Sequence, residues 1–215
     1  MLLDLVFKTV ETQPTLAIAP LIWLLGAVAI LVIEGAILII CSDTEKVEGK
    51  SIAVLGMEKS GKTTLLCHMR RIPYHRENED FPEFTYKLNG RELVIKEGRD
   101  IDGGDAWMET YKDRISKSDI VFFVFDAKKY LEDVYYLIET NGRLSFIKEE
   151  MKEKHWAILG THLDAMNSDE EKQSSIIDIQ KKVSDKPYKE LFLKNFIVLN
   201  MTEGKAIDDF LNKVI

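Results

Sequence analysis

Cysteine is scarce in this chain of 215 residues, which holds only Cys41 and Cys67. Two cysteines at this separation cannot supply a disulfide framework, and they fall short of the four ligands of a structural zinc site. The domain must therefore be stabilised by its hydrophobic core, and we expect it to lie in the reducing cytosol. The chain also lacks internal repeats and low-complexity tracts, which argues against a solenoid or a disordered linker.

Basic residues are outnumbered by acidic ones. The formal net charge is -7 and the sequence pI is about 5.3. No block of lysine and arginine interrupts the chain, so it lacks the electrostatic footprint that nucleic-acid phosphates require. We therefore expect no nucleic-acid partner.

Charge is almost absent from Thr15 to Cys41, where Glu34 is the one ionisable residue. About 25 helical residues span roughly 37 Å, which exceeds the hydrocarbon core of about 30 Å. A cleaved signal peptide is the alternative interpretation, but its apolar region should cover about 7 to 15 residues behind a basic start. Asp4 and Glu11 precede this run, so we favour a transmembrane helix over 15–41 that contacts the lipid bilayer.

Basic residues near the two ends of the run predict its orientation. Lys8 precedes it, whereas Lys46, Lys50 and Lys59 follow it, which favours a cytoplasmic location for the carboxyl-terminal part. The expected organisation is a short segment at 1–14, a transmembrane helix at 15–41, a linker at 42–49 and one folded domain at 50–215.

From residue 50 onward, β-rich runs alternate with helical patterns. The strands are expected at 50–55, 84–88, 92–98, 119–126, 154–160 and 194–199. The helices are expected at 62–72, 105–117, 129–152, 169–184 and 205–214. Asn89-Gly90 predicts a hairpin that makes the second strand antiparallel, so the fold class is α/β: a doubly wound, mostly parallel six-stranded sheet.

The first expected strand leads into GMEKSGKT, Gly56 to Thr63, which matches G-x-x-x-x-G-K-[ST]. Glycines let the backbone curl so that its N–H groups cradle phosphate oxygens, and the following helix adds partial positive charge. Lys62 is expected to reach the β- and γ-phosphates, and Thr63 to bind magnesium. The candidate phosphate-binding residues are Gly56, Glu58, Lys59, Ser60, Gly61, Lys62, Thr63 and Thr64.

Three later stretches carry further candidates. Asp100 and Gly103 form a D-x-x-G pattern, with the carboxylate placed to hold magnesium through water and the Gly103 N–H to meet a γ-phosphate. In ILGTHLD, Asp164 can accept hydrogen bonds from N1–H and the exocyclic amine of guanine, a pair of donors that adenine does not present in that way. Thr161 belongs to the same stretch.

The last candidate stretch is Asn200-Met201-Thr202, whose backbone could meet the guanine oxygen. In this order and at these intervals, the four stretches resemble the Ras-like small GTPases over roughly residues 50 to 215. ILGTHLD is similar to the family's GTKLD, with His162 in place of the lysine that lies along the guanine face. The resemblance implies GTP or GDP as ligand and Mg²⁺ as cofactor. The order of apolar helix and domain is similar to the signal recognition particle receptor beta subunit and, more loosely, to the Arf branch.

The chain departs from the family where hydrolysis is controlled. Gly104 follows the D-x-x-G pattern, where Ras-like enzymes carry the glutamine that orients the attacking water, so intrinsic hydrolysis should be slow. Thr85 is the only serine or threonine between Thr64 and Thr110, yet it falls in the second expected strand, so the switch-one residue is not identified.

Three functions follow from these features. The first is a membrane-anchored GTPase switch that recruits a cytosolic or membrane protein partner. The second is a docking subunit that holds GTP almost permanently. The third is a membrane-bound ATPase, which leaves Asp164 unexplained. Trp107 has two interpretations, an effector anchor or a core residue of its helix, and the second is favoured.

Overall fold

The computed structural model describes residues 51–74, 82–88, 91–95, 106–150, 154–166 and 168–214. Among these residues, no helix is both long and apolar enough to cross a membrane. The expected segments 1–14, 15–41 and 42–49 lie outside the described residues. The transmembrane helix therefore stays a prediction.

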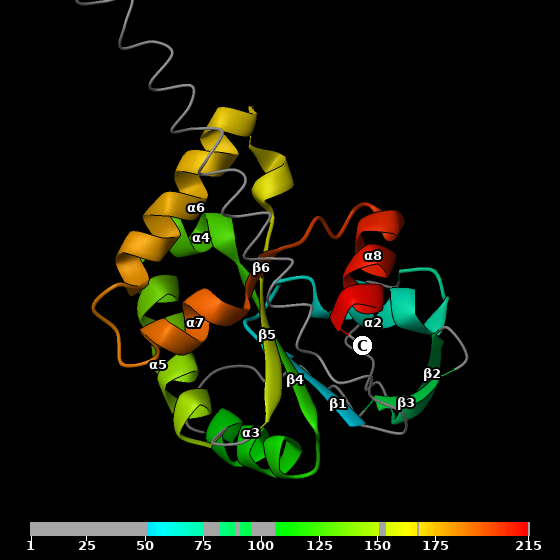
Figure 1. Cartoon of the computed structure of the whole chain (residues 1–215). Helices are drawn as coiled ribbons and strands as arrows, with labels where there is room; N and C mark the ends of the chain where they lie inside the picture. The colour runs from blue at the N-terminus through cyan, green and yellow to red at the C-terminus, as the bar shows by residue number, and fades with distance from the viewer. Residues whose placement is uncertain are drawn as a thin grey trace, which may run out of the picture. The chain divides into compact units, whose positions relative to one another are not determined.

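Six strands form one sheet in the order β2-β3-β1-β4-β5-β6 (Figure 1). They are β1 (Ser51–Gly56), β2 (Phe84–Leu88), β3 (Arg91–Ile95), β4 (Ile120–Asp126), β5 (His155–Thr161) and β6 (Phe196–Val198). Every neighbouring pair is parallel except β2 and β3, which are antiparallel with Leu88 opposite Arg91. The predicted fold class and the antiparallel second strand are confirmed, although Asn89 and Gly90 themselves lie outside the described residues.

Helices cover both faces of the sheet (Figure 1). On one face lie α2 (Lys62–Arg70) and α8 (Gly204–Val214). On the other lie α3 (Ala106–Ser116), α4 (Ala127–Glu132), α5 (Val134–Glu150), α6 (Asp169–Val183) and α7 (Lys189–Asn195). Since alternate strand residues point to opposite faces, β4 sends Phe122 to the first core and Phe123 to the second. This explains why the central strands are almost continuously apolar.

The single helix expected at 129–152 is wrong, because two helices meet at Asp133. Asp126 ends β4 and caps α4, its Oδ1 accepting a hydrogen bond from the Lys129 N–H at 2.9 Å. Asp133 has an extended backbone, and its carboxylate accepts from the N–H groups of Tyr135 and Tyr136 at 2.9 and 3.1 Å. An aspartate that caps the next helix thus interrupts a pattern that otherwise predicts one helix.

The helix α7 was not expected, and it displaces the start of the last strand from 194 to Phe196. Its seven residues bury Phe192, whose ring stacks on Phe196 at a centroid distance of 4.8 Å. So short a segment carries little periodic signal of its own, and its packing against the sheet stabilises it.

Candidate functional site

The loop from Gly56 to Thr63 joins β1 to α2 through three residues with positive φ. They are Gly56 at 142°, Lys59 at 55° and Gly61 at 96°. A Cβ on Gly56 would lie 2.0 Å from the carbonyl oxygen of Val124 in β4, so no larger residue fits there. The first glycine of the motif is therefore required by the sheet as well as by the curl of the loop.

The amino end of α2 has no side-chain cap from its own sequence, and we call it the open end of the helix. Gly61 occupies the capping position without a side chain, and the first turn contains no acidic residue. The partial positive charge of the helix end is therefore not neutralised from within the helix. Thr63 and Thr64, both partly buried, belong to this first turn.

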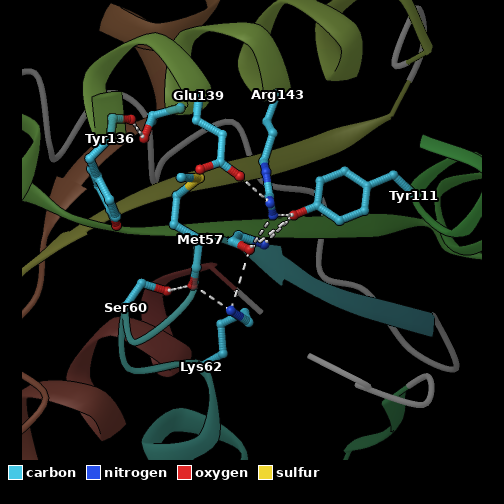
Figure 2. A network of polar contacts seen from close by, with 9 residues as sticks. Met57, Ser60, Lys62, Tyr111, Tyr136, Glu139 and Arg143 are labelled. Atoms are coloured by element: carbon cyan, nitrogen blue, oxygen red, sulfur yellow. Dashed lines mark hydrogen bonds and ion pairs between the residues drawn. The ribbon is translucent and has the colours of Figure 1, made fainter. Parts of the chain in front are cut away.

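The loop folds around the side chain of Lys62, which is only 8% exposed. Its Nζ donates to the carbonyl oxygen of Gly56 at 3.3 Å and to that of Met57 (Figure 2). Ser60 Oγ donates to the same Met57 oxygen at 2.7 Å. An ammonium group is thus held inside the loop, where phosphate oxygens would replace its carbonyl partners.

The other loop candidates differ in exposure. Glu58 and Lys59 are exposed and form an ion pair with each other at 3.2 Å, a contact that contributes little in water. Asp100, Gly103 and Gly104 lie outside the described residues, so their predicted roles stay predictions.

Within the described ranges, no group of three histidine, cysteine, aspartate or glutamate side chains could hold a metal ion. Magnesium in phosphate sites is held by one or two protein oxygens together with the phosphates, and it needs no such cluster. The Thr63 hydroxyl at the open helix end fits that limited requirement.

Thr161 joins the end of β5 to the phosphate loop. Its Oγ1 lies 2.8 Å from the carbonyl oxygen of Ser60 and 3.1 Å from that of Phe125, and the side chain is fully buried. The same Oγ1 lies 2.7 Å from Nδ1 of His162. The ILGTHLD stretch and the phosphate loop are therefore in direct contact.

His162 and Asp164 follow at the edge of this contact. The backbone of His162 is left-handed, with φ of 63°, and its side chain is 43% exposed. Its Nδ1 lies 3.6 Å from Oδ2 of Asp126. Asp164 is exposed within the short 3-10 helix η2 (Leu163–Ala165).

The loop after β6 also approaches the phosphate loop. The Asn200 Oδ1 accepts from the N–H and the hydroxyl of Thr202 at 2.9 and 2.7 Å, which makes a local turn. Met201 Cγ lies 3.2 Å from the position that a Cβ on Gly61 would take. The structure thus brings the loops after β1, β5 and β6 together.

A polar network that the sequence did not predict contacts the phosphate loop from α3 and α5. Tyr111 of α3 contacts the backbone N–H and carbonyl oxygen of Gly56, Arg143 of α5 contacts that carbonyl oxygen, and Glu139 contacts Arg143 (Figure 2). The available signal was helical spacing, since Arg143 belongs to the same buried face of α5 as Thr140 and Ile147.

Trp107 packs against this network. Its ring makes edge contacts with Tyr111 and Phe146 at centroid distances of 5.1 and 5.3 Å. The favoured interpretation of Trp107 as a core residue of its helix agrees with these contacts.

Solved structures resemble this fold. A probable GTP-binding protein engB matches with a TM-score of 0.54 and 17% identity, over 76% of this chain and 96% of that one. Era in complex with MgGDPNP and a segment of 16S ribosomal RNA matches with a TM-score of 0.56 and 15% identity, over 79% of this chain and 56% of that one. The Arl6 small GTPase from Trypanosoma brucei, with bound GppNp, matches with a TM-score of 0.52 and 16% identity, over 77% of this chain and 95% of that one.

These similarities establish the class of the fold. Residues 51–214, where the structure describes them, have the fold of the P-loop GTPases. The chain spans nearly all of engB and Arl6 and just over half of Era. No protein-family profile and no curated protein sequence matches this chain.

Proposed function

We propose that this chain binds GTP and GDP with magnesium and acts as a GTPase switch on a membrane. The observation that carries the proposal is the meeting of three strand-end loops: Thr161 contacts Ser60 at 2.8 Å, and Met201 lies against Gly61. A ligand whose phosphates lie in the first loop would have its base within reach of the other two.

The phosphate end is supported by Lys62 and by the open end of α2. Phosphate oxygens carry negative charge, so they are stronger partners for the Lys62 ammonium group than the neutral carbonyl oxygens of Gly56 and Met57. Thr63, together with Asp100 through water, would hold the magnesium ion. Bound magnesium would neutralise charge that develops during phosphoryl transfer.

The base end favours guanine because Asp164 is an exposed carboxylate directly after the contact between β5 and the loop. Its two oxygens can accept from N1–H and the amine of guanine, whereas adenine has an acceptor at N1. An ATPase would leave this carboxylate without a role. His162, at 43% exposure, offers an imidazole face for the purine ring.

Residues 15–41 would anchor the domain in the bilayer with the GTPase domain facing the cytoplasm. A bound partner protein would then be recruited to that membrane. Gly104 implies that hydrolysis is slow or depends on a partner.

One observation favours a second function, a docking subunit that retains GTP. Thr85 is the single serine or threonine between Thr64 and Thr110, and it lies inside β2 opposite Val94. It is therefore held in the sheet. A residue fixed in a strand is poorly placed to close over magnesium when nucleotide changes.

The experiment is to purify the whole chain of 215 residues in magnesium, extract and identify its bound nucleotide, and follow phosphate release in a single turnover. Co-purified GDP with slow release from added GTP supports the switch, and Lys62→Ala should abolish both binding and release. Tightly held, uncleaved GTP supports the docking subunit. Adenine nucleotide would contradict the guanine assignment.

A further inference from the structure

The backbone N–H and carbonyl groups of Gly56 are held by a side chain from another layer of the fold. The Gly56 N–H donates to the hydroxyl of Tyr111 at 3.0 Å, and that hydroxyl donates back to the Gly56 carbonyl oxygen at 2.9 Å. Gly56 is the residue at which β1 ends and the phosphate loop begins. One phenol therefore fixes both polar groups of the first loop residue (Figure 2).

Arg143 completes the attachment. Its Nη1 donates to the Gly56 carbonyl oxygen at 3.2 Å and to the Tyr111 hydroxyl at 3.1 Å, and its Nη2 meets Glu139 Oε1 at 2.5 Å. Arg143 is only 3% exposed, and its Nε has no hydrogen-bond partner. A buried guanidinium is costly unless it is paired, so Arg143 depends on its contacts with Gly56, Tyr111 and Glu139.

The surroundings fix the direction of the guanidinium. It lies 5.3 Å from the ring of Trp107 and 5.8 Å from that of Tyr111. Burial alone would lower the pKa of Arg143, but the Tyr111 oxygen and the Glu139 carboxylate raise it above its ordinary value. The group is therefore a permanent positive charge beneath the phosphate loop.

Lys62 shares the acceptor that Tyr111 and Arg143 use. The Gly56 carbonyl oxygen accepts hydrogen bonds from the Tyr111 hydroxyl at 2.9 Å, from Arg143 Nη1 at 3.2 Å and from Lys62 Nζ at 3.3 Å. A carbonyl oxygen has two lone pairs, so the three donors compete, and the longest of these contacts is the one to Lys62. Tyr111 and Arg143 can satisfy this oxygen when the lysine turns to a phosphate.

We propose that Tyr111 and Arg143 are positioning residues for nucleotide phosphates. They hold the backbone N–H and carbonyl groups of Gly56 so that the loop keeps its curl, and they keep the carbonyl oxygen hydrogen-bonded when Lys62 leaves it. The inference rests on the proposed function and concerns the phosphate end of that site. A purely structural role would predict lower stability without a specific loss of phosphate binding.

The test compares Tyr111→Phe with Phe210→Leu in the whole chain of 215 residues. The first change removes one hydroxyl and keeps the ring against Trp107. The second weakens the core under α8, on the opposite face of the sheet from Tyr111, and serves as the matched stability control. Dissociation constants for GDP and inosine diphosphate, which lacks the exocyclic amine of guanine, are measured with magnesium, together with the ³¹P spectrum of bound GDP.

We expect Tyr111→Phe to weaken both nucleotides by the same factor, about fivefold to tenfold, and to shift the β-phosphate resonance. The equal factor is diagnostic, because a change at the base end would alter the ratio of the two affinities. Phe210→Leu should leave both affinities within about twofold and the resonance unmoved.

Arg143→Met and Arg143→Lys give a second comparison. The methionine variant should weaken GDP at least as much as Tyr111→Phe, and the lysine variant, which keeps the charge, should recover part of the loss. If the Arg143→Met variant does not fold, the GDP affinity and the ³¹P spectrum of the Tyr111→Phe variant decide the question. Unchanged GDP affinity and resonance in Tyr111→Phe overturn the inference and leave the proposed function intact. If the unsubstituted chain binds neither GDP nor GTP, both the inference and the proposed function are overturned.

Discussion

The two faces of the sheet are stabilised in different ways. The core beneath α2 and α8 is made of apolar side chains, with Cys67 and Tyr86 among its described members. The core beneath α3 to α7 also contains buried polar groups, including Thr140 and Arg143. From this second face, Tyr111 and Arg143 reach the first residue of the phosphate loop, which Lys62 of α2 contacts from within the loop itself. The core of the first face is apolar and its helix α2 belongs to the site itself, whereas the second face supports the site from outside through buried polar side chains.

A second polar cluster lies on the same face. The hydroxyls of Tyr130 and Tyr188 both donate to Asn141 Oδ1, at 2.9 and 2.6 Å, and link α4, α5 and the segment before α7. Burial raises the pKa of Tyr130 to about 12. This cluster joins helices to one another, and its hydrogen bonds do not reach Gly56. It is therefore a buried polar cluster that affects stability alone, with which the Tyr111 network can be compared.

The largest effect is expected from Gly56→Ala, at the residue where β1 ends and packs closely against β4. The new Cβ would lie 2.0 Å from the Val124 oxygen, so strands β1 and β4 must separate. We expect a loss of roughly 3 kcal/mol or more in the free energy of unfolding, and no measurable GDP binding. Urea unfolding and nucleotide titration measure the two effects. Retention of normal stability would contradict the close packing at Gly56.

Alkaline pH should weaken the polar face through Tyr130. Its hydroxyl ionises near pH 12 in the folded chain, against a reference value of 10.0. Because the folded pKa is raised, this contribution to stability is complete below pH 10 and is lost as the pH rises to about 12.

The Tyr130→Phe variant tests this loss of stability between pH 10 and 12 when its unfolding free energy is measured across that pH range. Its unfolding free energy should fall by about 2 kcal/mol less than that of the unsubstituted chain between pH 10 and 12. At pH 7 the variant should be less stable by about 1 kcal/mol, because one hydrogen bond to Asn141 is lost. Parallel pH profiles for the two proteins would show that Tyr130 is not responsible.

Phe210→Leu probes the apolar face. Phe210 makes an edge contact with Phe122 at a centroid distance of 5.3 Å. We expect a loss of roughly 1 to 2 kcal/mol in thermal or urea unfolding, from lost burial and a small cavity. A selective loss of GDP affinity would contradict the division between the two faces.

The smallest effect is expected from Asp208→Asn. The Asp208 Oδ1 lies 2.8 Å from Nε2 of His68 and joins α8 to α2 at the surface. An exposed pair of this kind contributes about 0 to 1 kcal/mol, so the unfolding free energy should change by less than about 1 kcal/mol. A loss above 2 kcal/mol would mean that the apolar face also depends on a polar contact.

Much of the fold was predictable because its signals are local. Apolar runs gave the central strands, the Asn89-Gly90 pair gave the antiparallel neighbour, and GMEKSGKT gave the loop between β1 and α2. The break at Asp133 was missed because an aspartate within a helical pattern is read as an exposed residue unless its capping contacts are known.

The support of the site was not predictable from local pattern. Tyr111 and Arg143 contact Gly56 across 55 and 87 residues of sequence, so only the packing of α3 and α5 beneath β1 brings them together. Spacing on α5 could place Arg143 on the buried face, but it could not name Gly56 as its partner.

The most direct test of guanine-nucleotide binding is a competition between GDP and xanthosine diphosphate on the unsubstituted chain and on Asp164→Asn. Xanthine carries a carbonyl where guanine carries an amine, so an amide at position 164 can donate where the carboxylate could only accept. We predict that the substitution weakens GDP by about 100-fold and strengthens xanthosine diphosphate. Equal GDP affinity in both proteins, or preference of the unsubstituted chain for ADP, would contradict the assignment of this site to guanine.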